Sequence, residues 1–402
     1  MKLHEKLFQI FVFFLPSQLA LHFWPDWAFI FGIRIDYLSP TLYFSQVLLV
    51  ITFFAFLVEE KLFGNKRFVL QKLAIVGLLC LLPFLSTNPL VTLSRLPILF
   101  SACLLFWYVR SKRDRVATLV STPFLASFML VTVLTVIQFA LKHSVGGVFV
   151  LFGERPLSTL TPGIALVSLF GVDYLRPYAT FPHPNALAGT YLVLVLGLFP
   201  LLSRNKRIVS FLLLSVVIAL TFSQTVWVAL LLIPVWILLV KRLPRPLLSL
   251  SVVLFLCASI VSGLLPVLAS YPKEIAERFV LAHRALVTFA NHPFGVGFGA
   301  GILFSPRTLL QPVHNVFLFT ALELGIGGLI VLCLTLMKML LHARLHVAIL
   351  ILTVMTIGLA DHYFVSLLQP VLAVSLLAGL TTSPSSTRRS TSAPPSACRR
   401  RR

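Results

Sequence analysis

Apolar residues fill most of the chain in runs separated by short polar segments. The runs are about 17 to 25 residues long, enough for an α-helix to cross a hydrocarbon layer roughly 30 Å thick. Because the runs are continuous and do not alternate with polar residues, they indicate helices and not lipid-facing strands. The pattern predicts an all-α fold, a polytopic transmembrane helical bundle of about twelve spans. These are expected near residues 7–23, 41–58, 69–85, 93–109, 116–140, 185–202, 208–223, 225–240, 247–268, 315–337, 346–360 and 363–380.

Composition supports a membrane location and removes one class of partner. Hydrophobic residues make up 58% of the chain and charged residues 11%, with a mean hydropathy of +0.98, which excludes a water-soluble globule. A net charge of +21 would favour nucleic acid as partner of a soluble protein. Here the basic residues sit in short loops between spans, so we expect a lipid bilayer and no nucleic acid. No A-x-A-like cleavage site follows the first run, which we expect to be retained as a helix.

The basic residues also predict the orientation of the chain. Most of the 33 Lys and Arg residues lie in alternate connections, such as 61–72, 110–115, 204–207 and 241–245, and in the last residues, 388–402. The positive-inside rule places these segments and both termini in the cytoplasm. The two long polar loops, 141–184 and 269–314, are then extracytoplasmic, and the protein is expected in the inner (plasma) membrane. The tail 381–402 is rich in Ser, Thr, Pro and Arg, which predicts a disordered basic segment.

Cysteine positions argue against a metal or redox centre. Cys80, Cys103, Cys257 and Cys333 fall inside apolar runs, and Cys398 lies in the basic tail. No pair lies in a polar loop, so neither a disulfide framework nor a CxxC metal site is indicated. We expect no metal and no cofactor.

The second long loop is expected to begin with an amphipathic helix. Apolar side chains recur at helical spacing from about Pro272 to Phe289, with Ser270 available as a cap. The segment NHPFGVGFGAG follows it, and no strand precedes its glycines, which argues against a dinucleotide site. A close-packed turn near the bilayer is the simpler interpretation.

The end of the first long loop, RPYATFPHPNALAG, is expected to be rigid. Its prolines fix backbone angles and hold Arg176, His183 and Asn185 in a stiff approach to the sixth span. A stiff approach suits a site that must position a charged headgroup. His183 itself is expected to be a structural partner in this turn.

His314 stands where polar chain meets the apolar run at 315–337. A histidine at this boundary, near Arg278, Arg284 and Arg307, could be a general base beside a cationic phosphate site, or a hydrogen-bonded interfacial histidine. At helical spacing it heads a stripe of Leu318, Ala321, Gly325 and Gly328 that would allow close helix packing. Glu323 falls on the opposite side, so we do not expect it to pair with His314; it is either functional or hydrogen-bonded in packing. The segment Asp361-His362-Tyr363 is interpreted as an interfacial turn.

Four segments together resemble the O-antigen ligase and O-antigen polymerase family of membrane glycan-transfer proteins. They are RPYATFPHPNALAG leading into a span, the intramembrane TFSQT, HPFGVGFGAG in a large outer loop, and HNVFLFTALELGIGG. In the last, His314, Leu318 and Gly325 are similar to an H-x3-L-x6-G pattern of the ligases. The resemblance covers 176–335 and divides the chain into N-terminal helices with the first large outer loop (1–175), the ligase-like region (176–335), C-terminal helices (336–380) and the tail (381–402).

The resemblance implies transfer of a glycan from a polyprenyl diphosphate carrier to a glycan, lipid or protein hydroxyl on the outer face. His314 would be the general base, positioned by Asn315 or a neighbouring acid. Arg176 and Arg284 match the positions of diphosphate-binding arginines, with Arg278 and Arg307 as further candidates. The energy would reside in the donor, whose diphosphate is a good leaving group that requires no metal in principle.

Two departures and two alternatives limit this interpretation. Gln224 in TFSQT stands where the family often has an arginine, which puts a third cationic contact in doubt, and the loop helix region is short for a ligase. Ligase and polymerase activities both remain open, as do the glycan and the acceptor. A carrier or flippase for a lipid-linked or anionic solute is the main alternative, although no internal repeat is visible and the charges gather at the outer boundary. A non-catalytic envelope scaffold is the second alternative.

Overall fold

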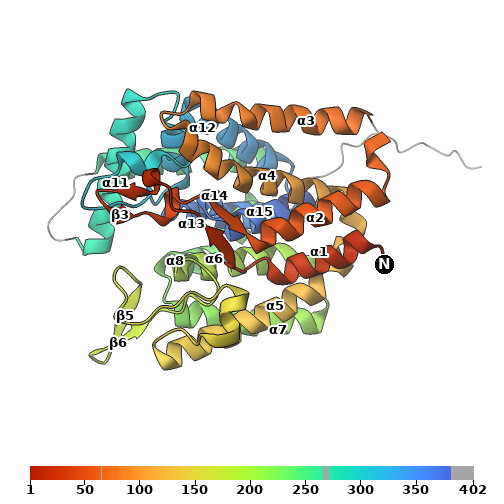
Figure 1. The fold of residues 1–402 in the computed structure, drawn as a ribbon, viewed down its shortest axis with the longest axis horizontal. Coiled ribbons are helices and arrows are strands. Elements are labelled where there is room, and N and C mark those ends of the chain that lie inside the picture. The colour runs from red at the N-terminus through yellow and green to blue at the C-terminus, as the bar shows by residue number, and fades with distance from the viewer. Residues whose placement is uncertain (65, 266–270, 382–402) are drawn as a thin grey trace, which may run out of the picture.

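The computed structural model describes residues 1–64, 66–265 and 271–381, and the chain within them is mostly helical (Figure 1). Within these residues six helical segments are long and apolar enough to cross a membrane. They are α4 (Pro89–Ser111), α5 (Arg113–Leu141), α6 (Pro184–Leu198) with the turn Phe199–Leu201, α8 (Gln224–Arg242), α9 (Arg245–Ser249) with α10 (Ser251–Leu264), and α12 (Val316–His342). The remaining helices are α1 (Leu3–Phe14), α2 (Phe44–Glu59), α3 (Lys66–Cys80), α7 (Arg204–Thr221), α11 (Lys273–Asn291), α13 (Leu345–Gly358), α14 (Tyr363–Ser366) and α15 (Leu368–Thr381).

These helices agree with a polytopic helical membrane protein, while the number of twelve spans and their orientation stay predictions. The first and the last of the expected spans are interrupted. The first run ends as a helix at Phe14, two residues before Pro16, whose ring cannot continue the helix, and the chain then forms strand β1 (Ala20–His22). The last run is divided between α14 and α15 by Leu367, which has an extended backbone. The proposed cap Ser270 and the tail 382–402 lie outside the described residues.

Three small antiparallel sheets, of two strands each, connect or follow the helices. The pairs are β1 with β4 (Thr41–Tyr43), β2 (Phe29–Ile30) with β3 (Ile33–Arg34), and β5 (Leu166–Leu169) with β6 (Val172–Leu175). Figure 1 shows β3, β5, β6 and α11 at the left end of the molecule and the N-terminus at the opposite end. The polar segments predicted to face outside therefore gather together, away from the N-terminus.

Helix α6 lies at the centre of the bundle. It is buried along nearly its whole length and packs against α7, α13 and α15. Glycine allows α6 to approach α14 and α15 closely, because a Cβ at Gly189 would lie 1.8 Å from the Tyr363 hydroxyl of α14, and one at Gly197 would lie 2.5 Å from the Leu377 side chain of α15. Its N-terminus is consequently held in place beside α14 and α15.

Helix α12 is broken at Gly325, whose φ of 65° and ψ of −166° are not helical. The interrupted backbone pairs with the glycine-rich turn after α11: Val296 and Gly297 donate to the carbonyls of Leu322 and Glu323, and Ile326 donates to Pro293. The prediction of one continuous stripe from His314 to Gly328 is therefore wrong, because the helix changes direction at Gly325. The prediction of a close-packed glycine turn is confirmed.

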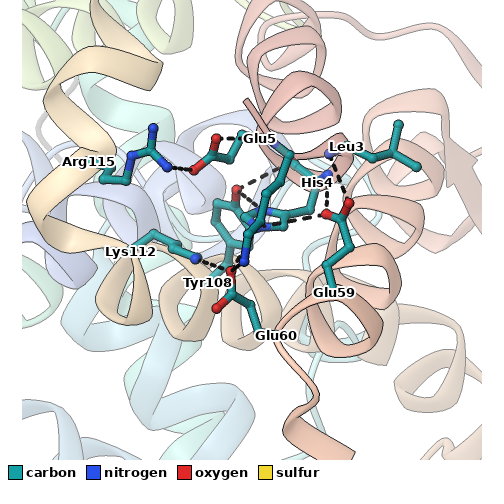
Figure 2. Close-up of polar contacts among 9 residues, drawn as sticks. Leu3, His4, Glu5, Glu59, Glu60, Tyr108, Lys112 and Arg115 are labelled. Carbon is teal, nitrogen blue, oxygen red and sulfur yellow. Dashed lines mark hydrogen bonds and ion pairs between the residues drawn. The ribbon is translucent and has the colours of Figure 1, made fainter.

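The opposite end of the bundle is held by a polar cluster of α1, α2, α4 and α5 (Figure 2). Buried His4 lies 2.9 Å from the Tyr108 hydroxyl and 3.3 Å from Glu60 Oε1. Glu60 also accepts from Lys2 at 2.7 Å and from Lys112. Arg115 pairs with buried Glu5 at 2.5 Å. These contacts join the ends of four helices with mutually compensating charges.

Candidate active site

His314 is placed by the residue that follows it. Asn315 caps α12: its side-chain oxygen accepts from the backbone N–H groups of Phe317 and Leu318 at 3.0 Å each. Its amide nitrogen donates to the Ser259 hydroxyl on α10 and to the carbonyl of Leu359 after α13. Asn315 is thus fully engaged in anchoring the start of α12, and it positions His314 through the backbone.

The side chain of His314 faces an acid from a distant part of the chain. Its Nδ1 lies 3.5 Å from Oδ1 of Asp361, which stands between α13 and α14. Its Nε2 lies 3.2 Å from Oε1 of Gln311. The imidazole is 22% exposed and the carboxylate 6%, so solvent reaches the histidine and the acid lies behind it. The neighbouring acid expected from the resemblance is therefore Asp361.

Asp361 connects His314 to the proline-rich segment before α6. Asn185 donates from its side-chain nitrogen to Asp361 Oδ2 at 3.2 Å. Arg176 donates from Nη2 to Asn185 Oδ1 at 2.6 Å, and from Nε to the carbonyl of Thr221 at 2.7 Å. Arg176, Asn185, Asp361 and His314 therefore form one connected series, and Thr221 ties it to the break between α7 and α8.

Electrostatics favour a charged Asp361 in spite of its burial. Burial alone would raise the pKa of this carboxyl, but its interaction with His314, with smaller contributions from Arg278 and His183, holds the pKa below its ordinary value. Asp361 therefore carries a negative charge at neutral pH and can stabilise a cation on the imidazole next to it.

Two further histidines of the cluster stay neutral. Burial lowers the pKa of His183 to about 4 and that of His362 to about 3. The Nδ1 of His183 accepts from the backbone N–H of Asn185 at 3.1 Å, which caps α6 and requires the unprotonated nitrogen. Nδ1 of His362 lies 2.6 Å from the Ser366 hydroxyl. His183 is thus a structural partner in its turn, as its position beside the prolines suggested.

The predicted arginines separate into two groups. Arg278 on α11 acts electrostatically on both Asp361 and Arg176, and has no hydrogen-bond or ion-pair partner among the described residues. Arg284, two turns further along α11, is exposed and donates to the carbonyl of Phe304 at 2.9 Å. No contact in the described chain joins Arg284 to His314, Asp361 or Arg176. Arg307 lies over the Phe31 ring, 4.7 Å from its centroid.

The remaining predicted residues lie outside this cluster. Gln224 is exposed at the start of α8. Buried Glu323 accepts from the backbone N–H groups of Gly299 at 2.7 Å and Gly301 at 3.3 Å. Glu323 therefore holds the glycine-rich turn against α12, which fits the hydrogen-bonded packing role, and it does not contact His314.

Asp361 is the site residue that the sequence interpretation missed. The Asp361-His362-Tyr363 segment was expected to be an interfacial turn, and it does connect two helices, but its acid is buried and shared by Asn185 and His314. A usable signal existed, since an acidic residue beside a histidine is uncommon between two strongly apolar runs. In the described part of the chain, no group of three His, Cys, Asp or Glu side chains is arranged to hold a metal ion.

Comparison with known proteins agrees with the sequence resemblance. Residues 209–333 match the family model described as O-Antigen ligase. The matched segment contains Arg278, Arg284 and His314, whereas Arg176, Asn185 and Asp361 lie outside it. No curated protein and no solved structure matched the chain.

Proposed function

Taking the O-Antigen ligase match at residues 209–333 as the premise, we propose that this protein transfers a glycan from a polyprenyl diphosphate carrier to a hydroxyl acceptor. We place this reaction at the extracytoplasmic face of the inner membrane. The observation that carries the proposal is the pairing of His314 with buried Asp361, in contact with the arginine-bearing segment before α6. A solvent-accessible imidazole backed by a carboxylate is the arrangement that general-base catalysis requires.

In the proposed reaction Nε2 of His314 takes the proton of the acceptor hydroxyl. The hydroxyl oxygen forms a bond to the anomeric carbon of the donor sugar, and the bond from that carbon to the diphosphate oxygen breaks. The electron pair leaves with the diphosphate, and Asp361 balances the positive charge on the imidazole. In the structure Nε2 of His314 is hydrogen-bonded to Oε1 of Gln311. In the reaction the acceptor hydroxyl would replace Gln311 as the partner of Nε2.

Cations are needed where the leaving group gains charge. Arg278 is the candidate for binding the diphosphate because its guanidinium has no ion-pair partner in the described chain and its positive charge lowers the pKa values of Asp361 and Arg176. Arg176 uses two of its nitrogens on Thr221 and Asn185, so its main contribution is to hold Asn185 and add positive charge to the site. A role for Arg284 in binding the diphosphate stays a prediction.

The test is a transfer assay with purified full-length protein. A polyprenyl-diphosphate-linked oligosaccharide would be incubated with glycolipid, oligosaccharide and peptide acceptors. His314→Ala should lower the transfer rate at least about 100-fold, the usual contribution of a general base. His143→Ala is the matched control, because His143 is also in an outer loop but its Nδ1 contacts only the neighbouring Ser144 carbonyl.

Two outcomes would overturn the proposal. Transfer by His314→Ala at the wild-type rate would remove this histidine as the base. If no acceptor is glycosylated but the protein moves the lipid-linked donor across a vesicle membrane, the carrier alternative would replace glycan transfer.

A further inference from the structure

A cavity with several cationic side chains lies near the His314 cluster. Its volume is about 390 Å³, within the range of small-ligand sites, and it is bounded by the first outer hairpins, α4 and the α14–α15 turn. Tyr37 and Ser366 line it, and both touch His362: the Tyr37 and His362 ring centroids are 5.7 Å apart, and Ser366 is hydrogen-bonded to His362. On its other side His362 meets His314, with ring centroids 5.2 Å apart.

Charged side chains in this cavity are unequally matched. Arg34, Arg95 and Arg155 line it, against the single acid Asp36. Asp36 lies 3.7 Å from Arg34 and 3.5 Å from Arg155, so one carboxylate serves two guanidinium groups. Arg95 is buried and donates to the Ser366 carbonyl at 2.6 Å, while its Nε has no hydrogen-bond partner within the described residues. A buried cation with an unused donor costs free energy unless an anion compensates it.

Aromatic side chains share the same walls. Trp24, Tyr37 and Tyr43 line the cavity, and the Arg34 guanidinium lies over the Trp24 ring, 4.5 Å from its centroid. Flat aromatic faces pack against the apolar faces of sugar rings, and arginine pairs bind carboxylate or phosphate through paired donors. The acid Asp36 can accept hydrogen bonds from sugar hydroxyls, which a glycan offers and an ionised diphosphate lacks.

We propose that this cavity binds an acidic sugar unit of the acceptor glycan, one bearing a carboxylate or a phosphate. The inference rests on the proposed glycan transfer and adds the acceptor class. A glycan bound in the cavity would be separated from His314 by one layer of side chains, His362 and Tyr37. The cavity would thus select the acceptor by charge, separately from the arginines that serve the donor.

The test measures binding without any donor, so that it does not depend on catalysis. The probes are a tetrasaccharide containing glucuronate and its neutral, carboxyl-reduced counterpart, titrated onto full-length protein in detergent at a fixed ionic strength of about 150 mM. The wild type should bind the acidic probe at least about 10-fold more tightly than the neutral one, a difference of about 1.4 kcal/mol. Arg34→Gln and Arg155→Gln should each reduce this preference, and the double variant should abolish it.

The controls separate this proposal from general charge effects and from the proposed reaction. Lys142→Gln removes an outer cation that lies over Tyr174, away from the cavity, and should keep the preference. His314→Ala should keep it as well, even though transfer is lost, so failed transfer and failed binding are distinguishable. Thermal unfolding of each variant verifies that it is folded; Arg34 and Arg155 are both exposed enough to be replaced without disrupting the core.

Three results would overturn the inference. Equal wild-type affinity for the two tetrasaccharides would show that the cavity does not discriminate between an acidic and a neutral glycan. An equal loss of preference in Lys142→Gln would assign the effect to the overall field of the outer face. The third result is a competition experiment in which inorganic diphosphate displaces the bound acidic tetrasaccharide at a lower concentration than unlabelled acidic tetrasaccharide does. This result would assign the cavity to the donor instead.

Discussion

One connected series of polar contacts positions the candidate base: it runs from Arg176 through Asn185 and Asp361 to His314. Asn185 accepts a hydrogen bond from Arg176 and donates one to Oδ2 of Asp361. The other carboxylate oxygen of Asp361, Oδ1, is the one that faces His314. Burial of the acid strengthens its interaction with a cation on the imidazole, because little water is present to screen the two charges. Asp361 is therefore a positioning residue for His314.

Replacing Asp361 by Asn should separate this role from simple stability. The amide cannot balance a charged imidazole, so we expect kcat for glycan transfer to fall by about 100-fold with little change in KM. Asp361→Glu should recover part of the activity because it restores the charge. A purely structural role is indicated instead if Asp361→Asn and Asp361→Glu lose activity and thermal stability in parallel.

The charge of Glu60 stabilises the folded protein. Hydrogen bonds from Lys112 and Lys2 lower the pKa of Glu60 to about 2 from its ordinary value of 4.5. A carboxyl with a depressed pKa stabilises the folded state above its unfolded pKa, and this contribution is lost as the pH falls from 4.5 toward 2.

Glu60→Gln should therefore lower the apparent Tm in detergent at pH 7 by about 2 °C, corresponding to about 1 kcal/mol for a partly exposed ion pair. The difference from wild type should shrink as the pH is lowered from 4.5 toward 2. A Tm difference that stays constant over this range would contradict the assignment. Glu274→Gln, on exposed α11 surface, is the matched control and should change Tm little.

Helix α12 and the glycine-rich turn after α11 depend on each other. The break at Gly325 frees the carbonyls of Leu322 and Glu323, which accept the N–H groups of Val296 and Gly297. Positive φ angles at Gly295, Gly297 and Gly299 let the turn approach closely, and a Cβ on Gly325 would lie 2.2 Å from the carbonyl carbon of Phe294. The turn thus fixes the direction in which α12 leaves the site.

Gly325→Ala should destabilise the protein by at least about 2 kcal/mol, since it adds both backbone strain and a backbone clash. Gly327→Ala is the control, because Gly327 is helical and a Cβ there meets nothing within 4 Å. This substitution should be neutral or stabilising by up to about 1 kcal/mol. Thermal unfolding compares the two, and equal Tm values would contradict the close packing described here.

The whole molecule places its irregular segments at one end and its N-terminal charge cluster at the other. Strands β2, β3, β5 and β6, helix α11 and His314 belong to segments predicted to face outside, and Figure 1 shows β3, β5, β6 and α11 at the end opposite the N-terminus. This polarity agrees with the proposed outer active site, where the donor diphosphate and the acceptor would meet on the same side.

The orientation can be tested by cysteine labelling. With the five native cysteines replaced by alanine, Asp173→Cys in the β5–β6 hairpin should react with a membrane-impermeant maleimide in intact cells. Asn205→Cys, at the start of α7 in a basic connection, should react only after the membrane is permeabilised. The reverse labelling pattern would show that the active site faces the cytoplasm.

Hydropathy, charge bias and motif spacing determined the helical membrane class, the amphipathic helix at 273–291, the rigid segment before α6 and the boundary position of His314. These features are local, because they depend on residues close together in the chain. The pairing of His314 with Asp361, the break at Gly325 and the cavity lined by Arg34, Arg95 and Arg155 were decided only by tertiary structure. An apolar helix can pack through many of its faces, so hydropathy does not specify which polar residues from distant segments, such as Asn185 and Asp361, meet where helices end.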